Sequence, residues 1–218
     1  MNIFKKSILT FALLAFGYTG LRAQSENSEV GLKGGANFSN FYSNEVDDQD
    51  LRIGIQGGLF FKAAITDFLA IQPEILYTQK GSTIKYDNFL TGNAEFTSKL
   101  NYVELPIMGV LNITDNLNIH AGPYFAYLVN VNIDNKAENS AFDFAEDLNE
   151  DDFNRLDYGV GVGVGFEFEV LRFGARYNYG MAEVGKEQSF SLDGSEVTSD
   201  QFKDLKNSTF SLYIGLSL

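Results

Sequence analysis

Charged and polar side chains recur at alternate positions within otherwise apolar segments of this chain, and they could serve catalysis, metal binding or internal ion pairing. The set with the inward phase is Lys33, Glu74, Glu104, His120, Asp157, Glu167, Glu169 and Arg176. An isolated ion in a poorly hydrated interior is costly, so opposite charges there must pair. Ion-pair networks are common structural features. We therefore interpret these residues as a structural polar network.

Catalysis would have to centre on His120, which is the only histidine. A nucleophile such as Ser211 or Ser217 and an orienting carboxylate such as Glu104 or Glu167 would have to lie beside it. No nucleophile motif surrounds either serine. The alternation places His120 deep in the interior, far from lipid headgroups and loop-borne substrates. We expect no catalytic residues and no enzymatic activity, and a lumen or loop enzyme is the alternative.

The sequence predicts no cofactor and no metal. One histidine and no cysteine exclude a zinc-type cluster. The glycines at 159–165 alternate within a strand and do not open a helix, unlike those of a phosphate loop. Acidic residues at 132–155 and 193–204 could bridge calcium, but their order does not match an EF-hand loop. A solvated, negatively charged surface is the favoured interpretation.

Residues 1–23 are typical of a signal peptide. Lys5 lies in the charged start, 8–16 form the apolar core, and Ala23 precedes the predicted cut. The apolar core is shorter than the roughly 20 residues that span a bilayer as a helix. We expect export, with residues 24–218 forming a single outer-membrane β-barrel domain.

The chain is acidic and contains no cysteine. Removing Lys5, Lys6 and Arg22 with the leader changes the formal charge from −13 to −16. Such a charge argues against nucleic acid as a partner. Without cysteine there is no disulfide framework and no thiol chemistry.

Alternating apolar and polar residues indicate the elements that position the polar set. From 157 to 170, Val and Phe alternate with Gly and Glu, and a strand sends these two groups to opposite faces. The predicted strands are 29–41, 51–66, 68–80, 100–113, 117–131, 156–170, 172–184 and 208–218. Eight strands, most a little longer than the roughly 9–11 residues that cross a bilayer, predict an all-β, antiparallel up-and-down transmembrane β-barrel.

The connections between these strands alternate in length. The short ones are 66–68, 114–116 and 170–172, and the long ones are 42–50, 81–99, 132–155 and 185–207. Outer-membrane barrels have short periplasmic turns and longer extracellular loops. The same asymmetry is therefore expected here, with both termini on the periplasmic side.

The composition of the two strand faces indicates which one meets lipid. The polar face of 157–169 is mostly glycine, which suits a narrow, crowded lumen better than a water-facing surface. The apolar face carries almost no charge, as lipid contact requires. The expected interfacial aromatics are Phe38, Phe41, Tyr158, Phe166, Phe168, Tyr177, Tyr179 and Phe210. A soluble lipocalin-like barrel, with the opposite polarity, is the alternative.

Several segments resemble the PorT-like outer-membrane β-barrel family. They are GLKGGANFS at 31–39, QPEILYTQKG at 72–81, YVELP at 102–106, AGPYFAYLV at 121–129 and YNYG at 177–180. The resemblance implies an outer-membrane barrel, and named members of that family are linked to type IX secretion. Outer-membrane barrels commonly end in an aromatic residue, whereas this chain ends in Leu218.

These observations leave several functions open. The first is a non-enzymatic barrel in a Gram-negative cell envelope whose extracellular loops bind partners, because loops on a rigid scaffold commonly carry function. The resemblance implies the second, an accessory role in secretion across the outer membrane. The others are an enzyme and a small-molecule pore. The expected partners are outer-membrane lipid and a protein at the extracellular loops or the periplasmic side.

Overall fold

The computed structural model describes residues 28–42, 50–88, 92–137, 153–185, 188–192, 195–199 and 205–218. The predicted signal peptide at 1–23 lies outside this part of the chain. The strands are β1 (Ser28–Tyr42), β2 (Asp50–Ala64), β3 (Leu69–Asn88), β4 (Gly92–Asn112), β5 (Leu117–Ala137), β6 (Leu156–Phe168), β7 (Leu171–Glu183), β8 (Gln188–Leu192), β9 (Ser195–Ser199) and β10 (Lys206–Ser217). Among these residues, no helix has the length and apolar character to traverse a bilayer.

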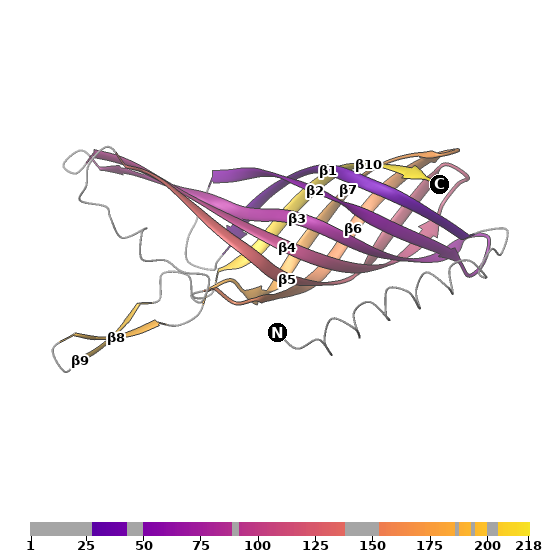
Figure 1. The fold of residues 1–218 in the computed structure, drawn as a ribbon. Helices are drawn as coiled ribbons and strands as arrows, with labels where there is room; N and C mark the ends of the chain where they lie inside the picture. Colours follow the sequence, from indigo (N-terminus) through magenta and orange to yellow (C-terminus); the bar gives the residue numbers. More distant parts are fainter. Residues whose placement is uncertain are drawn as a thin grey trace, which may run out of the picture.

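Eight of the strands close into one antiparallel barrel (Figure 1). The order around the barrel is β1-β10-β7-β6-β5-β4-β3-β2, and β1 closes it by pairing with β10 from Gly31 opposite Ser217 to Tyr42 opposite Lys206. Apart from the separate β8–β9 hairpin, strands adjacent in sequence are adjacent in space. The predicted eight-stranded up-and-down barrel is thus confirmed.

Short turns gather at one end of the barrel, where the C-terminus also lies (Figure 1). Ser28 lies at the same end, because it pairs with Ala63 beside the first short turn. The turns at 65–68 and 113–116 are built alike: the Thr66 hydroxyl accepts a hydrogen bond from the Leu69 amide at 3.1 Å, and Thr114 does the same for Leu117 at 3.1 Å. Threonine side chains stabilise tight turns in this way. The third short turn, at 169–170, begins one residue earlier than predicted.

At the other end, the strands are longer than predicted. Most of 81–99 is a β3–β4 hairpin, paired continuously from Gly81 opposite Lys99 to Asn88 opposite Gly92, and it projects past the rest of the barrel (Figure 1). β5 continues to Ala137, and the predicted loop 185–207 contains the β8–β9 hairpin. Outside the membrane, backbone pairing can hold a strand that has no apolar outer face. The alternation of apolar residues therefore stops before the strand ends.

The barrel has the polarity of a membrane protein. Large apolar side chains face outward and are exposed, such as Ile53 at 69% and Val162 at 57%, whereas inward residues such as Lys80 at 0% are polar and buried. Among the described outward positions, charges occur near the extracellular end, where Glu183 lies opposite Lys206. This arrangement fits lipid around the barrel wall, because charges are tolerated near the interface and not at mid-bilayer.

Several of the predicted aromatic residues are exposed toward the ends of the outer wall, but Tyr177 lies at the middle of β7 and Phe38 is half-buried. Phe166, Phe168 and Phe173 are near the periplasmic turns, and Tyr158 and Tyr179 are near the extracellular end. Phe41, expected among them, is only 2% exposed and points into the lumen. It lies on the same inward phase of β1 as Lys33, Asn37 and Ser39, so strand alternation itself excludes it from the lipid surface.

Candidate functional site

The middle of the lumen holds an ion-pair cluster centred on Glu74 of β3. The ammonium of Lys33 from β1 lies 3.0 Å from Glu74 Oε2. The Arg176 guanidinium from β7 donates to both oxygens, at 2.7 and 2.9 Å, which is the bidentate geometry that favours arginine. Gln72 adds a third donor at 2.8 Å. Glu74 is 1% exposed, so protein groups replace its hydration.

A second cluster, centred on Lys80, lies on the extracellular side of the first. Lys80 Nζ lies 2.7 Å from Glu104 Oε2 of β4 and 3.0 Å from Asp157 Oδ2 of β6. The Asn207 amide donates to Asp157 Oδ2 at 3.1 Å. The ammonium also stacks 4.3 Å from the centre of the Tyr124 ring. One fully buried cation therefore joins three strands.

A third cluster lies at the periplasmic end. Glu167 accepts from Lys62 at 2.8 Å, Arg172 at 2.7 Å and the Asn118 amide at 2.8 Å. Arg172 also pairs with Glu29 near the start of β1. This cluster is partly hydrated, because the Glu167 side chain is 20% exposed.

The structure brings seven of the eight predicted luminal residues into the barrel interior. Glu169 is the exception: it lies exposed in the β6–β7 turn, with a φ of 50°. The prediction extended the strand alternation to Val170, but β6 ends at Phe168 and the phase ends with it. The sequence reasoning also missed the luminal cations Lys62, Lys80 and Arg172.

A signal for these missed cations was present in the sequence. Lys80 is six residues after Glu74, and Arg172 is four residues before Arg176, so each shares the inward phase of a predicted luminal residue. Continuing the alternation to the ends of the strands would have included them.

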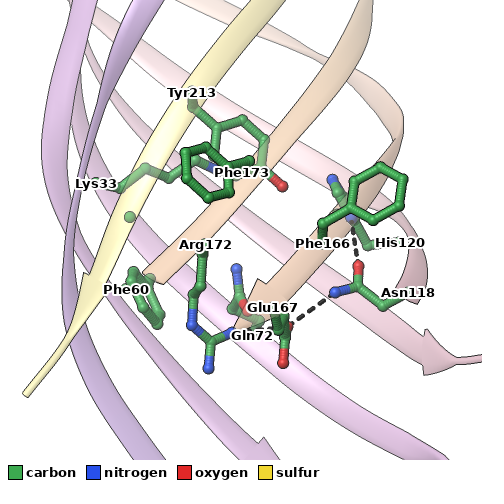
Figure 2. Close-up of a pocket in the computed structure, with 12 residues that line it drawn as sticks. Lys33, Phe60, Gln72, Asn118, His120, Phe166, Glu167, Arg172, Phe173 and Tyr213 are labelled. Atoms are coloured by element: carbon green, nitrogen blue, oxygen red, sulfur yellow. Dashed lines mark hydrogen bonds and ion pairs between the residues drawn. The ribbon is translucent and has the colours of Figure 1, made fainter. Parts of the chain in front are cut away.

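His120 is buried at 4% exposure between the middle and periplasmic clusters. Its Nδ1 lies 3.2 Å from Asn118 Oδ1, and Figure 2 shows the Asn118 amide between His120 and Glu167. The candidate serines bond elsewhere: Ser211 donates to Asn37 at 2.8 Å and Ser217 to Glu29 at 3.0 Å. The histidine thus takes part in the polar packing.

The structure describes only part of the chain that could hold a metal ion, and most of the residues of the calcium alternative, at 132–155 and 193–204, lie outside that part. The described ranges contain no group of three or more His, Cys, Asp or Glu side chains that could hold a metal ion.

A small cavity lies beside the middle cluster, lined among others by Lys33, Gln72, His120, Arg172 and Tyr213 (Figure 2). Its volume of about 20 Å³ is room for about one water molecule. Side chains fill the remaining space because inward glycines admit them: a Cβ on Gly165 would lie 2.8 Å from Asn118 Oδ1. An eight-stranded barrel is expected to be filled in this way.

The extracellular mouth of the lumen is closed by an apolar cluster that sequence reasoning missed. We call it the extracellular seal; its members are Phe41, Leu100, Tyr102, Tyr124, Ala126, Leu128, Phe153, Val184 and Leu205. Three of them lie between strands and are held by backbone bonds: Phe153 pairs with Gly185, and the Val184 amide donates to Leu205 O at 2.8 Å. Apolar side chains in a connection gave no periodic signal in the sequence.

Together, the apolar outer wall, the paired charges inside and the closed strand order define a transmembrane β-barrel with a plugged lumen. The chain belongs to the outer membrane protein beta-barrel domain family, whose model matches residues 22–184. The protein is therefore an outer-membrane β-barrel protein. No curated protein sequence matches it.

Solved structures with a similar fold are outer-membrane barrels of low sequence identity. Ail, the attachment invasion locus protein of Yersinia pestis, is 13% identical over 88% of this chain and 99% of its own, with a TM-score of 0.42. Neisserial surface protein A is 12% identical over 87% and 97%, with a TM-score of 0.47. OprG from Pseudomonas aeruginosa is 11% identical over 88% and 94%, with a TM-score of 0.42.

Proposed function

We propose that this barrel is a non-enzymatic protein of the outer membrane that binds a partner through its extracellular end, above all through the projecting β3–β4 hairpin. The extracellular seal is the observation that carries the proposal. Phe153 is 0% exposed, and Val184 and Leu205 are below 5%, so well-packed apolar side chains occupy the mouth that a substrate or solute would have to enter.

The charges beneath the seal support the same conclusion. In the middle and Lys80 clusters, the cations Lys33, Lys80 and Arg176 are matched by the anions Glu74, Glu104 and Asp157. Every one of these side chains is at most 5% exposed. An ion-conducting path needs charged groups that are hydrated or that exchange partners. The charged side chains in this interior are buried and paired with one another. Little conductance is expected in planar bilayers.

The β3–β4 hairpin provides a direct test. Thr83 and Thr97 lie opposite each other, so replacing 84–96 by Asn-Gly closes the hairpin with a two-residue turn and preserves the register. We expect a partner captured from intact envelopes by cross-linking to be lost from this variant. A matched control removes only the tip of the separate β8–β9 hairpin and should retain the partner. Equal capture by both variants and the unaltered protein contradicts the proposal.

The non-enzymatic part is tested at His120, the only imidazole. We expect a His120→Ala strain to show unchanged lipid and protein turnover. A loss of turnover without a loss of folded barrel would establish a catalytic role instead.

An accessory role in secretion rests on the resemblance to PorT-like barrels. The structure shows what the resembling segments contribute: 72–81 contains Glu74 and Lys80, 102–106 contains Glu104, and 121–129 contains Tyr124. These are residues of the luminal plug and the seal of this barrel. A deletion strain that exports all cargo normally would remove the secretion role.

A further inference from the structure

On the extracellular side, β5 rises well past its neighbour β6 and follows the β3–β4 hairpin (Figure 1). β5 is 21 residues long, whereas β6 is 13 residues long. The two strands pair as far as Tyr127 opposite Leu156, and the Leu128 amide then donates to Arg155 O at 2.7 Å. Residues 129–137 of β5 continue beyond this last bond. We call the side of 129–137 that faces away from β4 the β5 edge.

The chain that leads into β6 turns away from the β5 edge, because it takes part in the extracellular seal. Phe153 is a buried member of the seal and pairs with Gly185. The Asn154 amide donates to Val184 O at 2.9 Å. Both contacts are made with the chain that follows β7. Within the described ranges, no backbone hydrogen bond reaches the β5 edge.

On its other side, this part of β5 is held in an extended conformation by β4. The two strands pair without a register shift from Asn101 opposite Asn130 to Ala94 opposite Ala137. A strand with one unpaired side presents a row of N–H and C=O groups on which a further strand can form. Proline commonly blocks such edges, and 129–137 contains none. Because β4 already orders these residues, a peptide that pairs with them loses only its own conformational freedom.

The direction of the backbone N–H groups follows from the phase of the strand. Leu128 is buried in the seal and Val131 packs against it, so both side chains face inward. A register shift opposite Asn101 and Tyr102 inserts one extra residue into β5, which is why residues three positions apart share a face. Residues on one face of a strand direct their N–H groups to one side of it. The Val131 N–H therefore points to the β5 edge, as the Leu128 N–H points to β6.

The chain attached to the β5 edge is strongly acidic. Seven acidic residues and no lysine or arginine occur in 138–152, between Ala137 at the top of the edge and Phe153. Because both ends of this stretch are joined to the structure beside the edge, its charge stays in that neighbourhood. A negative potential attracts positively charged partners and suppresses negatively charged ones. An extended peptide rich in Lys and Arg therefore matches both the backbone and the charge.

We propose that the β5 edge binds an extended, basic segment of another protein, which adds one strand beside β5. The inference rests on the proposed partner binding at the extracellular end and names the kind of partner. A second copy of this chain does not fit. β5 runs outward in every copy in one membrane, and strands tilted by about 35–45° cross at about twice that angle in two barrels related by a two-fold axis. Their edges would cross and could not pair along their length.

Val131→Pro tests the backbone of the β5 edge. Proline removes the N–H that faces the edge and no N–H that bonds to β4, and edge strands tolerate proline at such positions. Val131→Ala is the matched control, because it removes more of the side chain than proline does and keeps the N–H. Gel mobility checks that each variant forms a folded barrel.

The probe is a synthetic peptide as long as 129–137 in which Lys and Val alternate. It is added to the full-length protein in phosphatidylcholine nanodiscs, and binding is measured by fluorescence anisotropy. We expect the unaltered protein and Val131→Ala to bind equally, and Val131→Pro to bind about tenfold more weakly because a ladder hydrogen bond is lost. If Val131→Pro does not fold, a probe with N-methyl groups on alternate amides makes the same comparison on the unaltered protein. A peptide of alternating Glu and Val should bind more weakly than the Lys peptide, by a margin that shrinks as the salt concentration rises.

Amide hydrogen exchange shows where the peptide lies, and we expect it to slow exchange within 129–137. Equal binding by Val131→Pro and Val131→Ala, or equal binding of the N-methylated probe, would overturn the proposal. So would a Val131 amide that is protected before the peptide is added, because the chain itself or a second copy would then cover the edge. If the Lys peptide does not bind while the 84–96 replacement still loses its partner, the β5 edge is refuted and the proposed function stands. If the peptide binds and that replacement keeps its partner, the role of the hairpin is refuted and the β5 edge stands.

Discussion

Lys80 is the luminal residue whose removal tests the account of the plug most directly. It is 0% exposed and lies 2.7 Å from Glu104 and 3.0 Å from Asp157. Lys80→Met keeps most of the apolar stem but leaves two buried carboxylates without their shared cation. Removing one partner of a buried ion pair costs about 3–5 kcal/mol. We expect the free energy of unfolding to fall by at least that amount.

Two further variants separate lost charge balance from lost packing. In Lys80→Met with Glu104→Gln and Asp157→Asn, no charge is left unpaired, and we expect most of the stability to return. Lys62→Met is the matched control, because Glu167 keeps Arg172 at 2.7 Å and is 20% exposed; its expected cost is about 1 kcal/mol or less.

Urea titration in lipid vesicles, followed by the gel mobility of the folded barrel, measures these differences. The chain has no tryptophan, so far-UV circular dichroism is the suitable second probe. If Lys80→Met were as stable as the unaltered protein, or less damaging than Lys62→Met, the Lys80 cluster could not be a tightly buried part of the plug.

Three further comparisons test the lumen, the wall and the turn. Gly161→Leu should cost about 1–3 kcal/mol because its Cβ would lie 2.6 Å from Asn178 Oδ1, whereas the outward Val162→Leu should be nearly neutral; the same urea titration compares them. Val162→Arg should lower the free energy of unfolding by about 2–4 kcal/mol, and Leu156→Arg, at the extracellular edge, by about 0–1 kcal/mol. Equal losses would show that the bilayer does not lie around the middle of β6. Glu169→Gly should raise stability by up to about 1 kcal/mol because φ is 50°, and a loss measured in the same vesicles would argue for a luminal ion pair.

The barrel itself could be predicted from sequence because its signal is periodic. The run from Tyr158 to Val170 alternates strictly, and the tight turns at Thr66 and Thr114 interrupt the pattern where the structure turns. The extracellular half was harder to predict. From Ser82 to Asn88, β3 is paired with β4 although the phase that faces lipid lower in the strand becomes polar, with Thr83, Lys85 and Asp87. The apolar outer face therefore does not specify this part of the strand, and pairing across the hairpin does.

The sequence predicts which residues line the lumen but not which of them form ion pairs. Strand phase places Glu74, Glu104 and Asp157 inside, but which cation meets each anion depends on the stagger of the closed barrel. Lys80 and Asp157 are separated by 77 positions in sequence, on strands that are not neighbours. Phe153, Val184 and Leu205 lie in connections, where no alternation of apolar and polar residues marks them. The extracellular seal is therefore recognised only in the folded structure.

The lumen is closed by two layers of different physical character, and this bears on where the protein can act. At the extracellular end, the seal excludes water with apolar side chains; below it, the charges are satisfied by one another and not by solvent. Moving a solute through would require breaking both layers, and each broken buried pair costs several kcal/mol. Binding at the outer wall or the extracellular hairpins requires neither. A rigid, filled barrel therefore serves best as a support that fixes its external surfaces in the membrane, and those surfaces are where substitutions should alter function without altering the fold.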